Sequence, residues 1–379
     1  MANILVEGWR FLAHSYAVVN QFQCLEMLKR PGLKLFHRDV PFYLPTWRPV
    51  DGLFDKVKET ALRGIKSPPP GLVADAAFRI AFPYDLKSST ARTVVFATSE
   101  YQSIPDICIA GHQSFKDAYR ESDCTIVTPS NWSKAGFIRE GASEERVVVV
   151  PHGVDPSLFR PVNRSRKNGL RRGLGWEGFV FLHIGAMTRN KGMDLLLRAF
   201  TSIIDRYPQA RLVLKGSDAL YSSKQNILHT FQHLSAAEQQ KILPRLTYLG
   251  ETFPFAKCAE LYQAADVYIS PYRAEGFNMP VLEAVACGLP VICTRGGPTD
   301  DFTQPDFALH VESTLHTFEK DHSQQWMLEP DVEHLAARMR EVIEQKEWGV
   351  RAHHLGPDFV ARRFTWSKVV DQLTSVLGV

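Results

Sequence analysis

The sequence predicts an α/β protein made of two parallel β-sheets, each surrounded by helices. Short apolar, β-branched runs alternate with segments of helical apolar spacing through most of the chain, which is typical of parallel sheets. This alternation stops at 160–178 and then begins again. The chain has 379 residues, which is long enough for two hydrophobic cores. We therefore expect two domains of similar size.

The first half contains short buried strands, each followed by a turn or a helix. The first strand ends at Gly8, and the last runs into the turn at 151–155. The strands are expected at 4–6, 93–97, 124–128 and 147–150, and the helices at about 15–28 and 133–140.

Residues 160–178 interrupt this pattern. Five of the nine residues from Arg164 to Arg172 are basic, and Asn and Gly lie among them. A charge run of this kind is usually a linker or a solvated face, so we interpret 161–178 as the linker between the domains. Attachment of these cations to an anionic membrane is the alternative.

The second half repeats the alternation. Residues 218–245 are interpreted as a partly helical insertion between two strands, and a last helix is expected at about 366–377. The strands are expected at 179–184, 211–214, 246–249, 265–271 and 291–293, and the other helices at about 193–204 and 280–287.

Two carboxylates flank the start of the helix at 280–287. The string from Glu275 to Glu283 reads E-G-F-N-M-P-V-L-E, and it follows a buried strand. Pro280 stands where a helix begins, so Glu275 is placed on a loop and Glu283 on the helix. Open α/β sheets bind ligands at the carboxyl ends of their strands, and a helix start suits a phosphate. Carboxylates at this position can accept hydrogen bonds from sugar hydroxyls.

The stretch 265–292, A-D-V-Y-I-S-P-Y-R-A-E-G-F-N-M-P-V-L-E-A-V-A-C-G-L-P-V-I, resembles the E-x7-E motif of retaining GT-B glycosyltransferases, specifically glycosyltransferase family 4. The resemblance implies an α/β fold of GT-B architecture, with two Rossmann-like domains facing a central cleft. It implies an acceptor-side domain at 1–160, the linker at 161–178, a nucleotide-sugar domain at 179–355, and a C-terminal helix at 356–379 that crosses back to the first domain.

The same resemblance implies a donor site. Glu275 reaches the transferred sugar, Glu283 binds the ribose, and Lys191 in the loop 185–192 neutralises the diphosphate. The family has an Arg where this chain has Ala186, and we expect Arg189 to supply the missing charge. The catalytic residues are then Glu275, Lys191 and Arg189, and the further donor-binding residues are Gly276, Phe277, Asn278, Met279, Leu282, Gly8, Gly216, Gly250 and Gly297.

Acceptor-side residues are expected after the first and second clear strands of the first half. Trp9 and His14 lie in the loop that reaches the donor and acceptor in the family, and Glu100 follows the strand 93–97. Trp9 is suited to stacking on a sugar ring, although core packing explains it equally well. Glu100 is either an acceptor-side residue or an ordinary loop residue.

These features predict a retaining hexosyltransferase that uses a UDP- or GDP-linked sugar and needs neither a metal nor a cofactor. The 379 residues contain no Asp-x-Asp, the metal-binding motif of the other common fold. Retention in the family is explained by front-side attack, in which the leaving phosphate takes the acceptor proton, so no protein nucleophile is required. The acceptor is a glycan, a lipid-linked sugar or a small molecule, and polysaccharide biosynthesis is the expected context.

Two alternatives stay open at this point. One is another GT-B enzyme, such as a sugar phosphorylase or a nucleotide-sugar epimerase. The other is a non-catalytic binding protein on a degenerate glycosyltransferase fold, for which Ala186 is the reason.

Composition excludes several other classes. A formal net charge of +3 gives no reason to expect nucleic acid, and the six cysteines form no C-x-x-C pair. No apolar run has the length of a membrane span, and the N-terminus lacks the pattern of a signal peptide. We expect a cytoplasmic protein and leave open its association with the cytosolic face of a membrane and its oligomeric state. His229 and His233 have the spacing of zinc ligands, but no third ligand is evident, and no metal site is expected.

Overall fold

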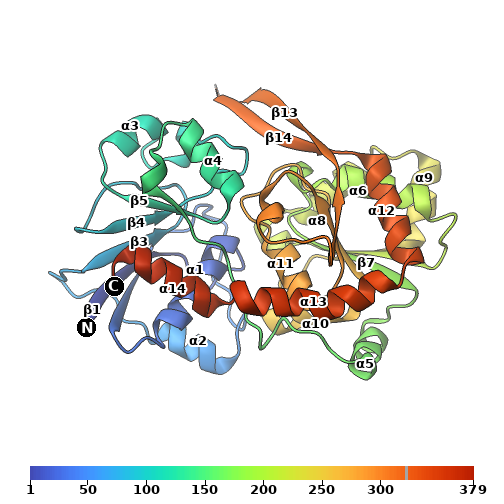
Figure 1. The fold of residues 1–379 in the computed structure, drawn as a ribbon, viewed down its shortest axis with the longest axis horizontal. Coiled ribbons are helices and arrows are strands. Elements are labelled where there is room, and N and C mark those ends of the chain that lie inside the picture. The colour runs from blue at the N-terminus through green and yellow to red at the C-terminus, as the bar shows by residue number, and fades with distance from the viewer. Residues whose placement is uncertain (321–322) are drawn as a thin grey trace. The chain divides into compact units, whose positions relative to one another are not determined.

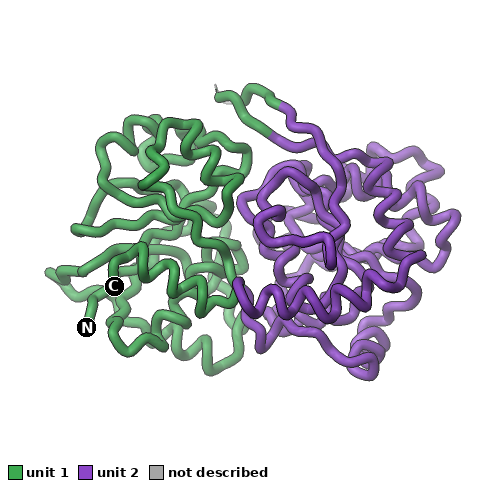
Figure 2. The backbone as a smooth tube through the Cα atoms, viewed as in Figure 1, with its two compact units in different colours: residues 1–153, 317–326, 364–379 green, residues 154–316, 327–363 purple. Residues whose placement is uncertain are grey.

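The computed structural model describes residues 1–320 and 323–379 and divides the chain into two compact units. Unit 1 contains Met1–Gly153, Thr317–Trp326 and Phe364–Val379, and unit 2 contains Val154–His316 and Met327–Arg363 (Figure 2). Each unit has a six-stranded sheet with helices packed against it (Figure 1). The prediction of two Rossmann-like α/β domains is therefore confirmed.

The sheet of unit 1 is parallel and has the order β2-β1-β3-β4-β5-β6. In the register, Ile4 of β1, the second strand of this order, lies between Leu35 of β2 and Ala76 of β3. The strands β2 and β3 were not expected from the sequence. The bounds are β1 (Ala2–Gly8), β2 (Leu33–Asp39), β3 (Ala76–Ile80), β4 (Thr93–Phe96), β5 (Thr125–Thr128) and β6 (Val147–Val149).

The helices of unit 1 begin at capped positions. In α4, the Ser130 hydroxyl accepts a hydrogen bond from the Ser133 N–H, which satisfies a donor of the first turn. The last helix, α14, packs against α1 by stacking Trp366 on Phe22, with ring centroids 5.2 Å apart. The bounds are α1 (Ser15–Met27), α2 (Lys56–Arg63), α3 (Phe115–Arg120), α4 (Asn131–Arg139) and α14 (Trp366–Leu377).

The sheet of unit 2 is also parallel, with the order β12-β11-β10-β7-β8-β9. The strands β7, β8 and β9 follow one another toward one edge of the sheet, whereas β10, β11 and β12 follow one another toward the other edge. The switch point between β7 and β10 is where open α/β sheets bind ligands. The bounds are β7 (Phe179–Ile184), β8 (Ala210–Lys215), β9 (Leu246–Leu249), β10 (Val267–Ser270), β11 (Val291–Thr294) and β12 (Ala308–Val311).

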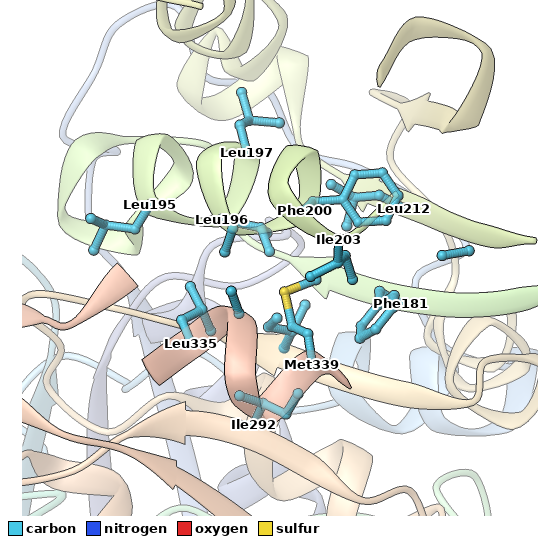
Figure 3. Packing of buried hydrophobic residues seen from close by; sticks show 14 of the residues in the cluster. Phe181, Leu195, Leu196, Leu197, Phe200, Ile203, Leu212, Ile292, Leu335 and Met339 are labelled. Atoms are coloured by element: carbon cyan, nitrogen blue, oxygen red, sulfur yellow. The ribbon is translucent and has the colours of Figure 1, made fainter. Parts of the chain in front are cut away.

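The helices of unit 2 build a continuous core with the sheet. Leu196 and Phe200 of α6 lie fully buried beside Phe181 of β7, and Leu335 and Met339 of α12 pack against the same cluster (Figure 3). The expected insertion at 218–245 is partly helical and supplies α7, α8 and α9. The bounds are α5 (Arg164–Leu174), α6 (Met193–Ile203), α7 (Asp218–Tyr221), α8 (Ser223–Phe231), α9 (Ala236–Ile242), α10 (Phe255–Ala264), α11 (Met279–Ala286), α12 (Val332–Glu344) and α13 (Glu347–Arg363).

The basic segment interpreted as a linker contains the helix α5. Lys167 and Arg171 each place a cationic nitrogen 2.8 Å from the carboxylate of Asp266, just before β10. The same carboxylate accepts a hydrogen bond from the Val180 N–H at 2.9 Å. Two of the five basic side chains thus fix the helix to the amino-terminal edge of the sheet.

A two-stranded element, β13 (Ser313–Lys320) and β14 (Ser323–Pro330), was also absent from the predictions. Within unit 1, the Trp326 N–H donates to the Tyr101 carbonyl at 2.9 Å, and the Arg139 guanidinium lies 4.0 Å from the Trp326 ring. Within unit 2, the Leu328 N–H donates to the Arg273 carbonyl at 2.8 Å. Among the described residues, no helix combines the length and the apolar character that crossing a membrane requires.

Candidate functional site

Two loops meet at the carboxyl ends of β7 and β10, the switch point of the second sheet. The loop 185–192 follows β7, and the loop 271–278 follows β10. The Arg273 N–H donates to the Asn190 carbonyl at 2.7 Å, and the Asn190 amide donates to the Ala274 carbonyl at 3.3 Å. Gly192 has a φ of +72°, and a Cβ there would lie 1.9 Å from the Pro271 carbonyl oxygen. Only glycine allows this close approach of the two loops.

These loops bring together two residues that the sequence predicted as catalytic. The Lys191 ammonium lies 2.6 Å from a carboxylate oxygen of Glu275. Both side chains are mostly buried, with exposed fractions of 18% for Lys191 and 9% for Glu275. Partial burial strengthens the Coulomb attraction between the two charges, because less water screens it.

Glu283 lies on α11 and has an unusual protonation equilibrium. Burial raises the pKa of its carboxyl group to about 7, although a hydrogen bond from the Tyr262 hydroxyl acts in the opposite direction. That hydroxyl donates to the Glu283 carboxylate at 2.8 Å. A change of pH near neutrality therefore changes the charge at this position.

The start of α11 is held by Asn278 in the left-handed conformation, with a φ of +79°. Its side-chain amide donates to the Ser270 hydroxyl at 2.9 Å and makes no capping bond to the helix. Pro280 occupies the first turn, as the sequence predicted. The positive end of the helix dipole lies at this turn, next to the loop that carries Glu275.

The predicted cation Arg189 lies on the surface of the loop 185–192. Its side chain is exposed and forms no ion pair with the residues that the structure describes. Its carbonyl accepts a hydrogen bond from Arg273 at 3.1 Å. The Ala186 carbonyl is held by the Ser223 hydroxyl at 3.1 Å, so α8 fixes the part of the loop where the family has an arginine.

The ends of β8 and β9 contain the predicted glycines Gly216 and Gly250. A Cβ at Gly216 would lie 2.5 Å from the Tyr248 hydroxyl, and one at Gly250 would lie 2.0 Å from the Asp218 carboxylate. Close packing of these two strand ends therefore requires both glycines. The neighbouring Lys215 is 5% exposed and donates from its ammonium to the Gly216 carbonyl at 2.5 Å.

The sequence placed the base of the donor near Lys215 and Gly216, but only Gly216 was predicted as a binding residue. Burial lowers the pKa of its ammonium, while Cys258, Asp218 and Glu251 act to raise it. Its ammonium also lies 4.9 Å from the centre of the Phe253 ring. A lysine at the end of the apolar strand L-V-L-K was the signal that could have identified it.

The remaining predicted donor residues surround the same loops. Phe277 stacks on Phe302 with ring centroids 4.5 Å apart, and a Cβ at Gly297 would lie 2.5 Å from the Tyr272 hydroxyl. Gly276 and Leu282 are buried, and Met279 is half-buried at the first residue of α11. The side chains of Phe277 and Leu282 are buried, so a ligand would meet mainly the backbone at these two positions.

The residues predicted on the acceptor side lie in unit 1. Trp9 is 1% exposed, its indole N–H donates to the Pro41 carbonyl at 2.9 Å, and it packs against His14. His14 caps α1 by accepting a hydrogen bond from the Tyr16 N–H, and burial lowers its pKa to about 4. This histidine is therefore neutral at physiological pH.

Gly8 and Glu100 complete the predicted set in unit 1. A Cβ at Gly8 would lie 2.7 Å from the Ile80 carbonyl oxygen, so glycine is required where β1 and β3 end side by side. Glu100 is half-buried, and its carbonyl accepts a hydrogen bond from the Trp132 indole at 2.9 Å. In the part of the chain that the structure describes, no group of three or more His, Cys, Asp or Glu residues could hold a metal ion.

Comparison with known proteins agrees with this arrangement. Residues 178–345 match the family model described as Glycosyl transferases group 1. The mannosylfructose-phosphate synthase of Agrobacterium fabrum is 26% identical over 263 residues, which cover 68% of this chain and 53% of that enzyme. A GDP-mannose-dependent monoacylated alpha-(1-6)-phosphatidylinositol monomannoside mannosyltransferase of Corynebacterium glutamicum is 25% identical over 314 residues, or 79% of this chain and 75% of that enzyme.

A solved structure extends the similarity to the fold of the whole chain. The crystal structure of Anabaena HepE in complex with UDP and glucose has a TM-score of 0.67 and 16% sequence identity, and the match covers 100% of both chains. The D-inositol 3-phosphate glycosyltransferase 1 of Catenulispora acidiphila is 34% identical over 163 residues, which cover 41% of this chain and 37% of that enzyme. The chain thus spans only about half of the Agrobacterium synthase and less of the Catenulispora enzyme. The chain therefore has the GT-B fold, and its residues 178–345 are similar to the family described as Glycosyl transferases group 1.

Proposed function

We propose that this protein is a retaining, metal-independent glycosyltransferase that moves a hexose from a UDP- or GDP-linked sugar to an acceptor. The single observation that supports this most directly is the ion pair between Lys191 and Glu275 at the switch point of the second sheet. It joins the cation proposed for the diphosphate to the carboxylate proposed for the sugar. Glu283 follows on the helix that starts beside them.

Lys191 is the proposed partner of the leaving diphosphate. Breaking the bond between the sugar and the diphosphate adds one negative charge to the leaving nucleotide, and a fixed cation in a partly buried site stabilises the leaving group more than it stabilises the intact donor. The dipole at the start of α11 adds to this effect. In this proposal Arg189, which is exposed, moves toward the phosphates when the donor binds.

Glu275 and Glu283 are the proposed partners of the two sugar rings of the donor. When Lys191 turns to the diphosphate, the Glu275 carboxylate becomes an acceptor for hydroxyls of the transferred hexose. The Glu283 carboxylate accepts hydrogen bonds from the ribose hydroxyls in its ionised form. Charged acceptors form hydrogen bonds of roughly twice the strength of neutral ones, which fixes the orientation of the donor.

The choice of donor and acceptor follows from the relatives. HepE was crystallised with UDP and glucose, and the Corynebacterium enzyme depends on GDP-mannose, so both bases are candidates here. The latter acts on a phosphatidylinositol mannoside, whereas the Agrobacterium enzyme is a mannosylfructose-phosphate synthase. We therefore include lipid-linked, glycan and small-molecule acceptors, and the front-side attack described above accounts for retention.

Thermal unfolding with added nucleotides tests the donor site. UDP, GDP, ADP and their hexose conjugates are added to the purified protein in the presence of EDTA. A ligand that binds the folded state raises the melting temperature according to its affinity and concentration. We expect a rise with UDP or GDP that disappears in Glu283→Ala and persists in Glu260→Ala, a matched carboxylate on α10. No rise with any nucleotide would contradict the proposal.

The reaction is tested by the product. With the nucleotide that binds, its hexose conjugate and a panel of acceptors, NMR should detect a product with the anomeric configuration of the donor. Consumption of inorganic phosphate would instead indicate a phosphorylase, and conversion of the donor without an acceptor would indicate an epimerase. Binding of the donor without turnover on any acceptor would support a non-catalytic protein.

A further inference from the structure

Arg273, two residues before Glu275, has the most saturated hydrogen-bonding environment near the two loops. It is 3% exposed, and its guanidinium group donates hydrogen bonds to two carboxylates. Its Nη1 and Nη2 lie 2.6 and 2.8 Å from the two oxygens of Asp194. Its Nε and Nη2 lie 2.6 and 2.7 Å from the two oxygens of Glu329. Nη1 also donates to the Arg189 carbonyl at 3.1 Å.

These contacts use all five N–H donors of the guanidinium group. Two planar carboxylates match the planar fork of an arginine, and a lysine ammonium cannot reproduce both pairs. Because no donor remains and the group is buried, Arg273 has nothing left to offer a ligand. Its role must therefore be to hold the segments that it contacts.

Arg273 contacts the loop that carries Lys191, the helix that follows this loop, and β14. Asp194 lies in the first turn of α6, which begins directly after the loop that carries Lys191. Arg189 belongs to that loop itself, and Glu329 belongs to β14. The backbone of Arg273 adds a donated bond to the Asn190 carbonyl at 2.7 Å and an accepted bond from the Leu328 N–H at 2.8 Å.

We propose that Arg273 is a positioning residue that sets the separation of Lys191 and Glu275 without touching the donor. This inference rests on the proposed function for its kinetic consequence, but the distance that it predicts is independent of any activity. Shifts of about 1 Å in reacting groups cost about a hundredfold in rate. Loss of the hydrogen bonds of Arg273 is therefore expected to lower the rate of transfer more than it weakens nucleotide binding, which Glu283 and α11 still support.

The test compares Arg273→Lys with Arg171→Lys. Both substitutions keep the positive charge and disturb a buried pair with a carboxylate in unit 2, but Arg171 binds Asp266 at the opposite edge of the sheet. With UDP-glucose or GDP-mannose as donor, we expect Arg273→Lys to lower kcat about 10- to 100-fold while the Kd for the nucleoside diphosphate changes by less than about threefold. Arg171→Lys should leave both values near those of the natural protein.

Glu329→Gln provides a second variant if Arg273→Lys does not fold. It lies on neither loop, keeps the size of the side chain, and should lower kcat selectively but less strongly. A kcat for both variants within twofold of the natural protein would overturn the positioning role. Equal losses of kcat and nucleotide binding, in parallel with the melting temperature, would also overturn it, since they would indicate a merely structural role.

A crystal structure of whichever of the two variants folds separates this inference from the proposed function. We expect the Lys191 ammonium and the Glu275 carboxylate to lie farther apart than the 2.6 Å of the natural protein. An unchanged distance would overturn the inference even if transfer is observed. Absence of transfer by the natural protein and by Arg171→Lys would overturn the proposed function, while the measured distance would still decide the role of Arg273.

Discussion

The Lys191 ammonium and the Glu275 carboxylate lie 2.6 Å apart, although they come from loops that follow different strands. Each group therefore neutralises the other before a ligand arrives. A donor that uses Lys191 for its diphosphate and Glu275 for its sugar must replace this contact with two new ones. The pair keeps both charges compensated in a site from which water is largely excluded.

Replacing Glu275 with Gln should separate binding from catalysis. Lys191 then loses its ion pair with Glu275, so we expect UDP or GDP to bind at least as tightly as to the natural protein. Transfer should fall by about 100-fold, because a neutral amide is a weaker acceptor for the hexose hydroxyls. Calorimetry and initial rates measure the two effects, with Glu260→Gln as the control. A Glu275→Gln protein with the natural kcat would exclude a catalytic role for this carboxylate.

The raised pKa of Glu283 should make stability depend on pH. The group has an ordinary value of 4.5 and a value of about 7 in the folded protein, so the folded state binds the proton more tightly. Its stabilising contribution is complete below about pH 4.5 and is lost as the pH rises through about 7, by about 3 kcal/mol at most. Between pH 5 and 8, the free energy of unfolding of the natural protein should therefore fall relative to that of Glu283→Gln. Parallel curves for the two proteins would contradict the raised pKa.

Nucleotide binding should show the opposite trend. In the proposed function, the ionised carboxylate of Glu283 is the form that accepts the ribose hydroxyls, so the affinity for the nucleotide should rise from pH 6 to pH 8. Glu283→Gln should lose this dependence and bind with similar affinity throughout. Fluorescence or calorimetric titrations at fixed ionic strength measure it, and a dependence that survives in the Gln variant would assign it to another group.

Replacing Gly192 with Ala should disrupt the contact between the two loops. The residue has a φ of +72°, and its Cβ would lie 1.9 Å from the Pro271 carbonyl oxygen, so both strain and collision oppose an alanine. We expect a loss of at least about 2 kcal/mol in the free energy of unfolding, together with weaker nucleotide binding. Gly169→Ala is the matched control, because nothing lies within 4 Å of its Cβ and alanine favours the helix α5. A Gly192→Ala protein as stable as this control would show that the loops can separate without cost.

Asp266→Asn should destabilise the protein without affecting the donor. Burial would raise the pKa of Asp266, but Lys167 and Arg171 outweigh it and lower the pKa below 3.8. The carboxylate therefore stabilises the fold above its ordinary pKa and loses this effect as the pH falls below it. We expect Asp266→Asn to lose about 3 kcal/mol near pH 7, because two cations lose their partner, with unchanged Kd for the nucleotide. A changed Kd would mean that Asp266, at the amino-terminal ends of the strands, influences the candidate site at their carboxyl-terminal ends.

The sequence alone was sufficient for features that depend on neighbouring residues. Apolar periodicity located β7 and α6, and the string around Pro280 placed Glu275 on a loop and Glu283 on a helix. These features have local causes, such as the spacing of buried side chains and the fixed φ of proline. Local patterns therefore predicted the strand-to-helix units on which the candidate site lies.

Features that depend on distant partners could not be predicted. Arg273 is only one charged residue in a loop until Asp194 and Glu329, 79 and 56 positions away, come to lie beside it. The segment 161–178 has the composition of a linker, but Asp266 gives Lys167 and Arg171 a buried partner and so favours the helix α5. The edge strand β2 reads L-K-L-F-H-R-D, in which three polar residues follow only three apolar ones, and this pattern is too short to mark a strand.

Asn278 gives the start of α11 a property that glycine could not provide. Its left-handed backbone is restricted by a side chain that is itself tied to Ser270. A glycine there would sample many more conformations in the absence of ligand, and binding would have to remove them. The helix end at which we propose that the donor phosphate binds is thus already ordered, so less of the affinity for the nucleotide would be lost as conformational entropy.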